Sequence, residues 1–165
     1  MVAQLISAGA RKRSSLRQQG FLLPRHTRYF PRRQHFSDRR RLMKVLIIED
    51  DSDMCDLLGL LVERLGYDSL LATKGEEGIE KAIAEKPGLI LVDMKMPIMN
   101  GREVARRLRA NAETKEISIL AKTALYRSDD LNACLLAGCN AYIVKPFGVR
   151  DIQARIPALL GGTGP

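Results

Sequence analysis

Residues 89–93 read Leu-Ile-Leu-Val-Asp, an apolar run that ends in an acid. Four consecutive apolar residues are typical of a strand that is covered on both faces, as in a parallel sheet. A second apolar run, Val-Leu-Ile-Ile at residues 45–48, is followed by Glu49, Asp50 and Asp51. Because parallel strands end at the same edge of their sheet, we expect these acids to lie close to Asp93. Such a group of carboxylates repels itself unless a hard cation neutralises it.

The chain alternates apolar runs with helical patterns five times from residue 43 onward. The expected strands cover residues 44–48, 67–71, 89–92, 117–122 and 141–144, and the expected helices cover residues 53–65, 76–85, 101–110, 129–137 and 149–159. At the first helix, Ser52 is suited to cap the start and Gly66 is suited to end it. Five such units predict an α/β fold with a doubly wound, five-stranded parallel sheet and right-handed crossovers.

The length and composition fit one globular domain. The chain has 165 residues, of which 45% are hydrophobic and 28% are charged, enough to bury a sizeable core. The net charge of +8 is concentrated at one end. Residues 1–42 hold 11 of the 27 basic residues and one of the 19 acidic residues, so the remainder holds 16 bases and 18 acids. The expected folded part is therefore close to neutral.

Residues 1–42 lack a sustained apolar period and are rich in Arg, Ser and Gln. We expect them to form a disordered basic extension, followed by a domain over residues 43–160 and a frayed tail over residues 161–165. Three interpretations of the extension stay open. It is a basic arm for nucleic acid, an organellar targeting segment, or the product of a misplaced translation start. We favour the last, because Met43 opens directly into the first strand.

The cysteines and the hydropathy predict a cytoplasmic protein. Cys55, Cys134 and Cys139 are odd in number and follow no secretory signal, so reduced thiols are the simplest interpretation. Both histidines lie within residues 1–42, which makes a metal site built on these cysteines unexpected. Each long apolar stretch is interrupted by a charge too early to span a membrane.

Polar residues follow four of the expected strands. These are Glu49 and Asp50, Asp93, Thr123, and Lys145. Each alone would most simply be a helix cap or a turn residue, but all of them at successive strand ends suit phosphoryl transfer. A divalent cation and an ammonium would neutralise phosphate oxygens while a carboxylate attacks phosphorus. Ligands made only of oxygen favour Mg²⁺.

The sequence resembles the response-regulator receiver domains of two-component signalling over about residues 44–160. The resemblance rests on Lys44–Asp51 (KVLIIEDD), Leu91–Gly101 (LVDMKMPIMNG), Thr123-Ala124, and Ala141–Phe147 (AYIVKPF). It implies a flavodoxin-like, CheY-like sheet of strand order 2-1-3-4-5. The implied function is a phospho-acceptor signalling switch or phosphorelay step. It is not an enzyme beyond its own phosphorylation and dephosphorylation.

The resemblance also implies a role for each site residue. Asp93 would accept the phosphoryl group from a histidine kinase or a histidine phosphotransfer protein. Mg²⁺ would be held by Glu49, Asp50, Asp93 and the backbone carbonyl of Lys95. Lys145 would pair with a phosphoryl oxygen, Thr123 would turn its hydroxyl toward the phosphoryl group, and Ala124 would leave that group room. The Lys145-Pro146 bond would be cis.

The implied switch couples Thr123 to Tyr142. When Thr123 moves toward the phosphate, an aromatic at the position of Tyr142 fills the vacated space. The face formed by the helix at 129–137, the strand at 141–144 and the helix at 149–159 would then change its affinity for an unidentified downstream protein. Lys122 departs from the family, where its position is usually apolar, so its ammonium must reach solvent or a carboxylate. For Asp51 we favour helix capping over metal binding.

Three alternatives to a single-domain response regulator remain. A receiver-like module that is not phosphorylated would normally lack one of the acids or the lysine, and here all are present. A flavodoxin-like cofactor binder needs a neutral loop after the first strand, whereas residues 49–51 would repel a flavin phosphate. A nucleic-acid binder would use only the basic extension.

Overall fold

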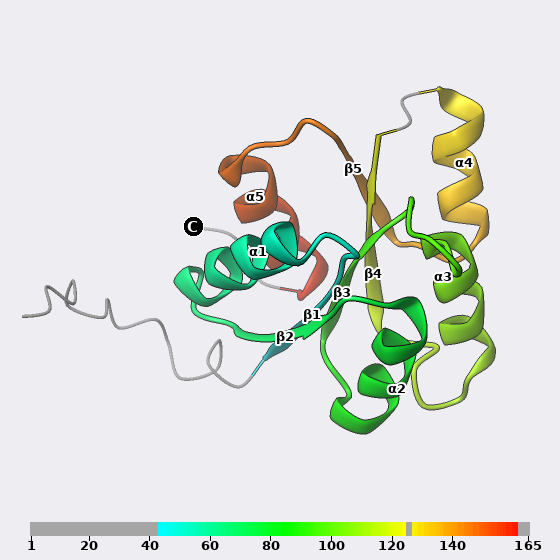
Figure 1. Cartoon of the computed structure of the whole chain (residues 1–165), viewed down its shortest axis with the longest axis horizontal. Coiled ribbons are helices and arrows are strands. Elements are labelled where there is room, and N and C mark those ends of the chain that lie inside the picture. Colours follow the sequence, from blue (N-terminus) through cyan, green and yellow to red (C-terminus); the bar gives the residue numbers. More distant parts are fainter. Residues whose placement is uncertain (1–42, 125–126, 162–165) are drawn as a thin grey trace, which may run out of the picture. The chain divides into compact units, whose positions relative to one another are not determined.

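The computed structural model describes residues 43–124 and 127–161 (Figure 1). The expectations of a disordered extension over residues 1–42 and of a frayed tail concern residues outside these ranges, apart from Gly161. Within the described ranges, no helix combines the length and the apolar composition needed to cross a bilayer.

Five strands and five helices alternate along the described chain. They are β1 (Lys44–Ile48), α1 (Ser52–Arg64), β2 (Asp68–Ala72), α2 (Gly75–Glu85), β3 (Leu89–Asp93), α3 (Gly101–Ala110), β4 (Ser118–Thr123), α4 (Ser128–Leu136), β5 (Ala141–Val144) and α5 (Val149–Leu159). Each expected element is present, with boundaries within one residue of the prediction. β2 begins one residue late because the backbone N–H of Tyr67 bonds to the Val62 carbonyl at the exit of α1, while Asp68 pairs with Lys44.

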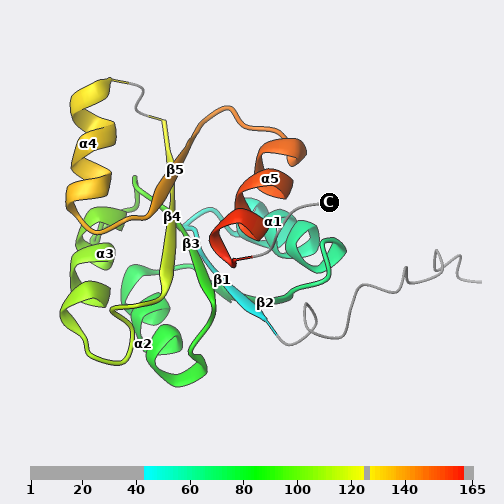
Figure 2. The same ribbon diagram turned by 180° about the vertical axis from the view of Figure 1, so that it is seen from behind.

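The strands form one parallel sheet of order β2-β1-β3-β4-β5, which confirms the predicted fold. The central strands β1 and β3 are apolar on both faces because each face is covered. Figures 1 and 2 show α1 and α5 on one face of the sheet and α2, α3 and α4 on the other. Alternate residues of a strand point to opposite faces. The even-numbered residues of β1 and β3 accordingly pack on the side of α2, α3 and α4, and the odd-numbered ones on the side of α1 and α5.

The start of α1 corrects one prediction. Asp51, rather than Ser52, is the N-cap: its Oδ1 accepts a hydrogen bond of 3.0 Å from the backbone N–H of Met54, and Ser52 is the first helical residue. This geometry agrees with the interpretation of Asp51 as a capping residue. At the other end of α1, Gly66 adopts a φ of +88°, as expected for the residue that ends a helix.

Both ends of the described domain pack at the N-terminal edge of the sheet. A Cβ on Gly88, just before β3, would meet the side chain of Leu160 at 2.9 Å and that of Met43 at 3.2 Å. The hydroxyl of Ser118 also donates to the Leu159 carbonyl at 3.2 Å. The functional residues predicted from the sequence lie at the opposite edge.

Candidate functional site

Three carboxylates converge where β1 and β3 end. One carboxylate oxygen from each of Glu49, Asp50 and Asp93 lies within 4.8 Å of the others, and we call these residues the acidic cluster. Glu49 is 2% exposed and Asp93 is 3% exposed, whereas Asp50 faces solvent. β1 and β3 are hydrogen-bonded neighbours, and that pairing brings the three acids together. Charges of one sign at this spacing need cations beside them.

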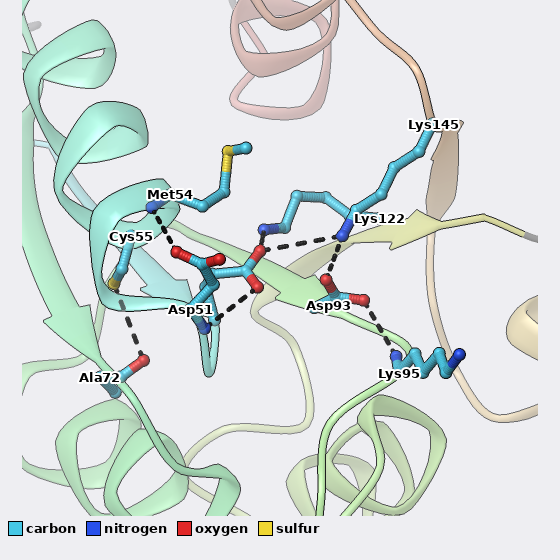
Figure 3. A network of polar contacts seen from close by, with 9 residues as sticks. Asp51, Met54, Cys55, Ala72, Asp93, Lys95, Lys122 and Lys145 are labelled. Atoms are coloured by element: carbon cyan, nitrogen blue, oxygen red, sulfur yellow. Dashed lines mark hydrogen bonds and ion pairs between the residues drawn. The ribbon is translucent and has the colours of Figure 1, made fainter.

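The Asp93 carboxylate is fixed from two sides. Its Oδ1 accepts a hydrogen bond of 2.9 Å from the backbone N–H of Lys95, and its Oδ2 pairs with the Nζ of Lys145 (Figure 3). The lysine side chain comes from the segment directly after β5, on the far side of β4 in the sheet. Asp93 is thus held by the loop that follows it and by a lysine distant in sequence.

A close approach of the backbone positions Asp93 as well. Gly101 is the first residue of α3, and a Cβ on it would collide with the carbonyl oxygen of Asp93 and with the end of the Met94 side chain. The backbone N–H of Gly101 also faces the Met94 carbonyl at 3.4 Å. Gly101 ends the segment that carries the family resemblance, but no role of its own was predicted for it. Its lack of a side chain lets α3 pack directly against the end of β3.

Lys145 bridges the acidic cluster and the end of β4. Its backbone N–H donates to the Thr123 carbonyl at 2.7 Å, and its Nζ lies 4.0 Å from Oε2 of Glu49 in addition to its contact with Asp93. Burial lowers the pKa of this ammonium. The hydrogen bond to Asp93 and the charges of Asp93, Glu49 and Asp50 outweigh burial and raise the pKa above its usual value. The Lys145-Pro146 bond is cis, as the resemblance implied.

Lys122 is a second cation in this network, and it is fully buried. Its side chain has 0% exposure, and its Nζ pairs with Oε2 of Glu49. The ammonium therefore reaches a carboxylate and not solvent. Burial lowers the pKa of Lys122, and the hydrogen bond and charge of Glu49 oppose that shift without cancelling it. Figure 3 shows the ends of Lys122 and Lys145 directed toward the same group of carboxylates.

The expected site residues did not include Lys122, although the alternation of side chains along β4 indicates which face of the sheet it lies on. Lys122 is opposite Asp93 in the register of β3 and β4. It follows Leu120 by two residues and so shares its sheet face, the face covered by α1 and α5. A lysine at this position had to project among the groups at the end of β3.

The predicted switch residues lie on the other face of the sheet. Thr123 is buried and follows Ala121 and Ile119 at alternate positions, both of which belong to the core beside α2, α3 and α4. Tyr142 is opposite Ala121 in the register of β4 and β5 and is half-buried against the same core. Ala124 is exposed just after β4. Thr123 and Tyr142 thus belong to neighbouring strands and one core.

The described acids, lysines and hydroxyl form an arrangement suited to phosphoryl transfer. Oxygen ligands at the solvent-facing edge of the acidic cluster match the donor set that Mg²⁺ prefers. Lys145 already contacts Asp93, where it would neutralise charge on an incoming phosphoryl group. These features define a class: doubly wound α/β proteins with carboxylates and a lysine at the C-terminal edge of the sheet.

The family follows from comparison with known proteins. Residues 45–157 match the model of the response regulator receiver domain, and the chain belongs to this family. It is 39% identical over 119 residues to the response regulator ArlR of Staphylococcus saprophyticus, an alignment that covers 72% of this chain and 53% of ArlR. The chain spans about half the length of the curated relatives it matches.

Solved structures agree with the fold. The chemotaxis protein CheY4 of Vibrio cholerae superimposes with a TM-score of 0.68 at 24% identity, covering 71% of this chain and 98% of that protein. The receiver domain of a sensor histidine kinase from Pseudomonas aeruginosa superimposes with a TM-score of 0.67 at 28% identity, covering 73% and 98%. That structure has a magnesium ion coordinated in its active site cleft. Receiver domains are signalling switches that interact with histidine kinases and downstream effectors.

Proposed function

We propose that Asp93 accepts a phosphoryl group from a phosphohistidine of a histidine kinase or a histidine phosphotransfer protein. A carboxylate oxygen of Asp93 attacks phosphorus, the P–N bond breaks, and its electron pair returns to the imidazole. The observation that carries this proposal is the Asp93 carboxylate itself, buried among two other acids and paired with Lys145. The product is an aspartyl phosphate.

We assign the metal site to Glu49, Asp50, Asp93 and the backbone carbonyl of Lys95. The charge and spacing of the acidic cluster fit Mg²⁺, which when bound would neutralise phosphoryl oxygens. Lys145 stabilises a further phosphoryl oxygen. Thr123 donates its hydroxyl to the phosphoryl group, and Ala124 leaves space beside it.

Phosphorylation with a small donor tests this function. Acetyl phosphate and Mg²⁺ should add one phosphoryl group to the protein, seen as a single mass increment in the intact mass spectrum. Asp93→Asn should abolish the increment. Asp68→Asn is the matched control, because Asp68 is exposed at the start of β2, at the opposite edge of the sheet. No increment in the wild type, or an equal one in Asp93→Asn, would refute the proposal.

The output of the switch is proposed for the α4-β5-α5 face. Leu135 and Leu136 of α4 and Val149 of α5 expose 43%, 88% and 54% of their surface, and Tyr142 of β5 is half-buried against the core beside α2, α3 and α4. When Thr123 turns toward the phosphoryl group, Tyr142 moves inward and this face changes its affinity for a downstream protein. The same phosphoryl group is available for relay to another protein.

Amide hydrogen exchange locates the switch. Treatment with acetyl phosphate and Mg²⁺ should change exchange in peptides from α4, β5 and α5, and leave α2 unchanged. Asp93→Asn, treated in the same way, should show no change. Unaltered exchange over α4, β5 and α5 in a fully phosphorylated sample would contradict the proposed output face.

We further propose that residues 43–160 constitute one cytoplasmic receiver domain that acts through protein contacts. β1 begins at Lys44 and α5 ends at Leu159, which supports these boundaries. Nucleic-acid binding by the basic extension, one of the alternatives, predicts that DNA affinity falls steeply with salt and is lost when residues 1–42 are deleted.

A further inference from the structure

Lys122 is a buried cation whose partner, Glu49, is buried as well. An apolar residue would fill its place beside Leu120 and Ile143 without desolvating a charge. Replacing a buried ion pair with apolar groups is often neutral or stabilising. Two apolar residues could therefore replace the Lys122–Glu49 pair without loss of stability, but removing Lys122 alone leaves Glu49 as an unpaired buried charge.

The only acid to which Lys122 is directly bonded among the described contacts is also a proposed metal ligand. Oε2 of Glu49 contacts the Nζ of Lys122 and lies 4.0 Å from the Nζ of Lys145. Oε1 of Glu49 lies 3.5 Å from the backbone N–H of Asp51. Both oxygens of this carboxylate thus already face hydrogen-bond donors. A metal ion that uses Glu49, directly or through water, must share it with Lys122.

The charges of the acidic cluster and its two lysines also indicate that Lys122 competes with a metal ion. The acidic cluster carries three negative charges, and the two ammonium groups that contact it carry two positive charges. Lys145 alone would leave two negative charges for a divalent cation to neutralise, whereas both lysines together leave one. A fixed cation in a site of low dielectric also repels Mg²⁺ directly.

We propose that Lys122 is a resident cation of the acidic cluster that competes with Mg²⁺ for Glu49 and so sets how tightly the site holds the metal. The inference rests on the proposed magnesium site and adds a residue that tunes it. Lys122 neutralises Glu49 when the metal is absent and weakens metal binding when it is present.

Two substitutions remove the charge of Lys122, and one of them keeps a hydrogen-bond donor toward Glu49. Lys122→Met removes the charge and leaves an unbranched apolar side chain that lacks only the terminal nitrogen position. Lys122→Gln removes the charge but retains an N–H donor toward Glu49. Mg²⁺ affinity is measured by isothermal titration calorimetry, and the melting temperature is measured with and without saturating Mg²⁺. Both variants should bind Mg²⁺ at least about tenfold more tightly than the wild type, because a fixed positive charge has been removed from the metal site.

The melting temperatures provide a second readout. Without metal, both variants should melt below the wild type, since Glu49 then lacks its closest cation. Mg²⁺ should raise their melting temperature by more than it raises that of the wild type, because tighter binding stabilises the folded state more. In a Glu49→Gln background, Lys122→Met should change the affinity for Mg²⁺ by less, as competition at Glu49 requires.

The outcomes distinguish this inference from the proposed function. If both variants bind Mg²⁺ as tightly as the wild type, or more weakly, Lys122 does not compete with the metal and the inference is wrong. The proposed function still stands in that case, provided that Asp93 accepts a phosphoryl group. If the wild type neither binds Mg²⁺ nor accepts a phosphoryl group, the proposed function fails and the inference with it.

Discussion

Replacing Gly101 with alanine would drive a methyl group into the carbonyl oxygen of Asp93. The other nearby atom, the end of the Met94 side chain, can move aside, but the carbonyl belongs to a central strand paired on both sides. Overpacking of this kind typically costs about 1–3 kcal/mol. The gain in helix propensity from glycine to alanine is at most about 1 kcal/mol. Because the collision is with backbone, the upper part of that range applies, and after the gain in helix propensity we expect the free energy of unfolding to fall by about 1–2 kcal/mol.

The same substitution should slow phosphorylation. To relieve the collision, α3 and the end of β3 must move apart, which displaces the Asp93 carboxylate from its contacts with Lys95 and Lys145. A misplacement of about 1 Å in a reacting group can cost about a hundredfold in rate. We expect the melting temperature to fall by about 4–8 °C and the rate of phosphorylation by acetyl phosphate to fall at least about tenfold.

Gly59→Ala is the matched control. Gly59 is a buried glycine inside α1, and its Cβ would approach a flexible atom, Cδ2 of Leu71, at 3.0 Å. This variant should keep its melting temperature, measured by circular dichroism, and its rate of phosphorylation, measured by intact mass. A Gly101→Ala protein that melts and reacts like the Gly59→Ala protein would show that the contact with Asp93 does not position the acceptor.

Three further predictions concern single side chains. Because the folded-state pKa of Lys145 is raised, its pairing with Asp93 stabilises the protein fully below about pH 10.4 and loses this effect as the pH rises through the folded pKa. The difference in unfolding free energy between wild type and Lys145→Met, measured in urea, should therefore be constant from about pH 7 to 9 and shrink above about pH 10.4; a difference that grows with pH would contradict this. The guanidinium of Arg109 donates to the carbonyls of Gly138, Lys115 and Ile117 at 2.8–2.9 Å. Arg109→Lys should destabilise the protein by about 1–3 kcal/mol, because one ammonium cannot reach all three carbonyls. An unchanged free energy of unfolding in urea would refute this role. Burial raises the pKa of Cys139 to about 12, so iodoacetamide at pH 8 should label this thiol far more slowly in the native protein than in urea, and equal rates would show that Cys139 is accessible.

The sequence predicted the sheet well because its signals are local. The continuous apolar runs of β1 and β3 identify strands covered on both faces, and the acids directly after them are placed by the parallel direction of those strands. Asp93 and Glu49 therefore meet as predicted. The start of α1 was harder to predict, because Asp51 and Ser52 are adjacent and both side chains are good helix caps.

Contacts between distant strands were harder to predict. Lys122 pairs with Glu49 across 73 residues of sequence, and the choice between solvent and a carboxylate depends on which side chains surround it. The collision that any side chain on Gly101 would make with Asp93 depends on how closely α3 approaches the end of β3. Periodicity places Lys122 on the sheet face that carries Asp93, but its choice of Glu49 as partner and the collision at Gly101 are both set by the packing of whole elements.

The meeting of Met43 and Leu160 beside Gly88 has a consequence for how this domain combines with others. Entry and exit of the chain are neighbours at one end of the sheet, while the acceptor chemistry is at the other. A domain whose ends adjoin can be inserted into a host loop, or joined to new partners on either side, at little conformational cost. The two ends of the domain, where other segments would be joined, are thus separated from the acidic cluster by the length of the strands.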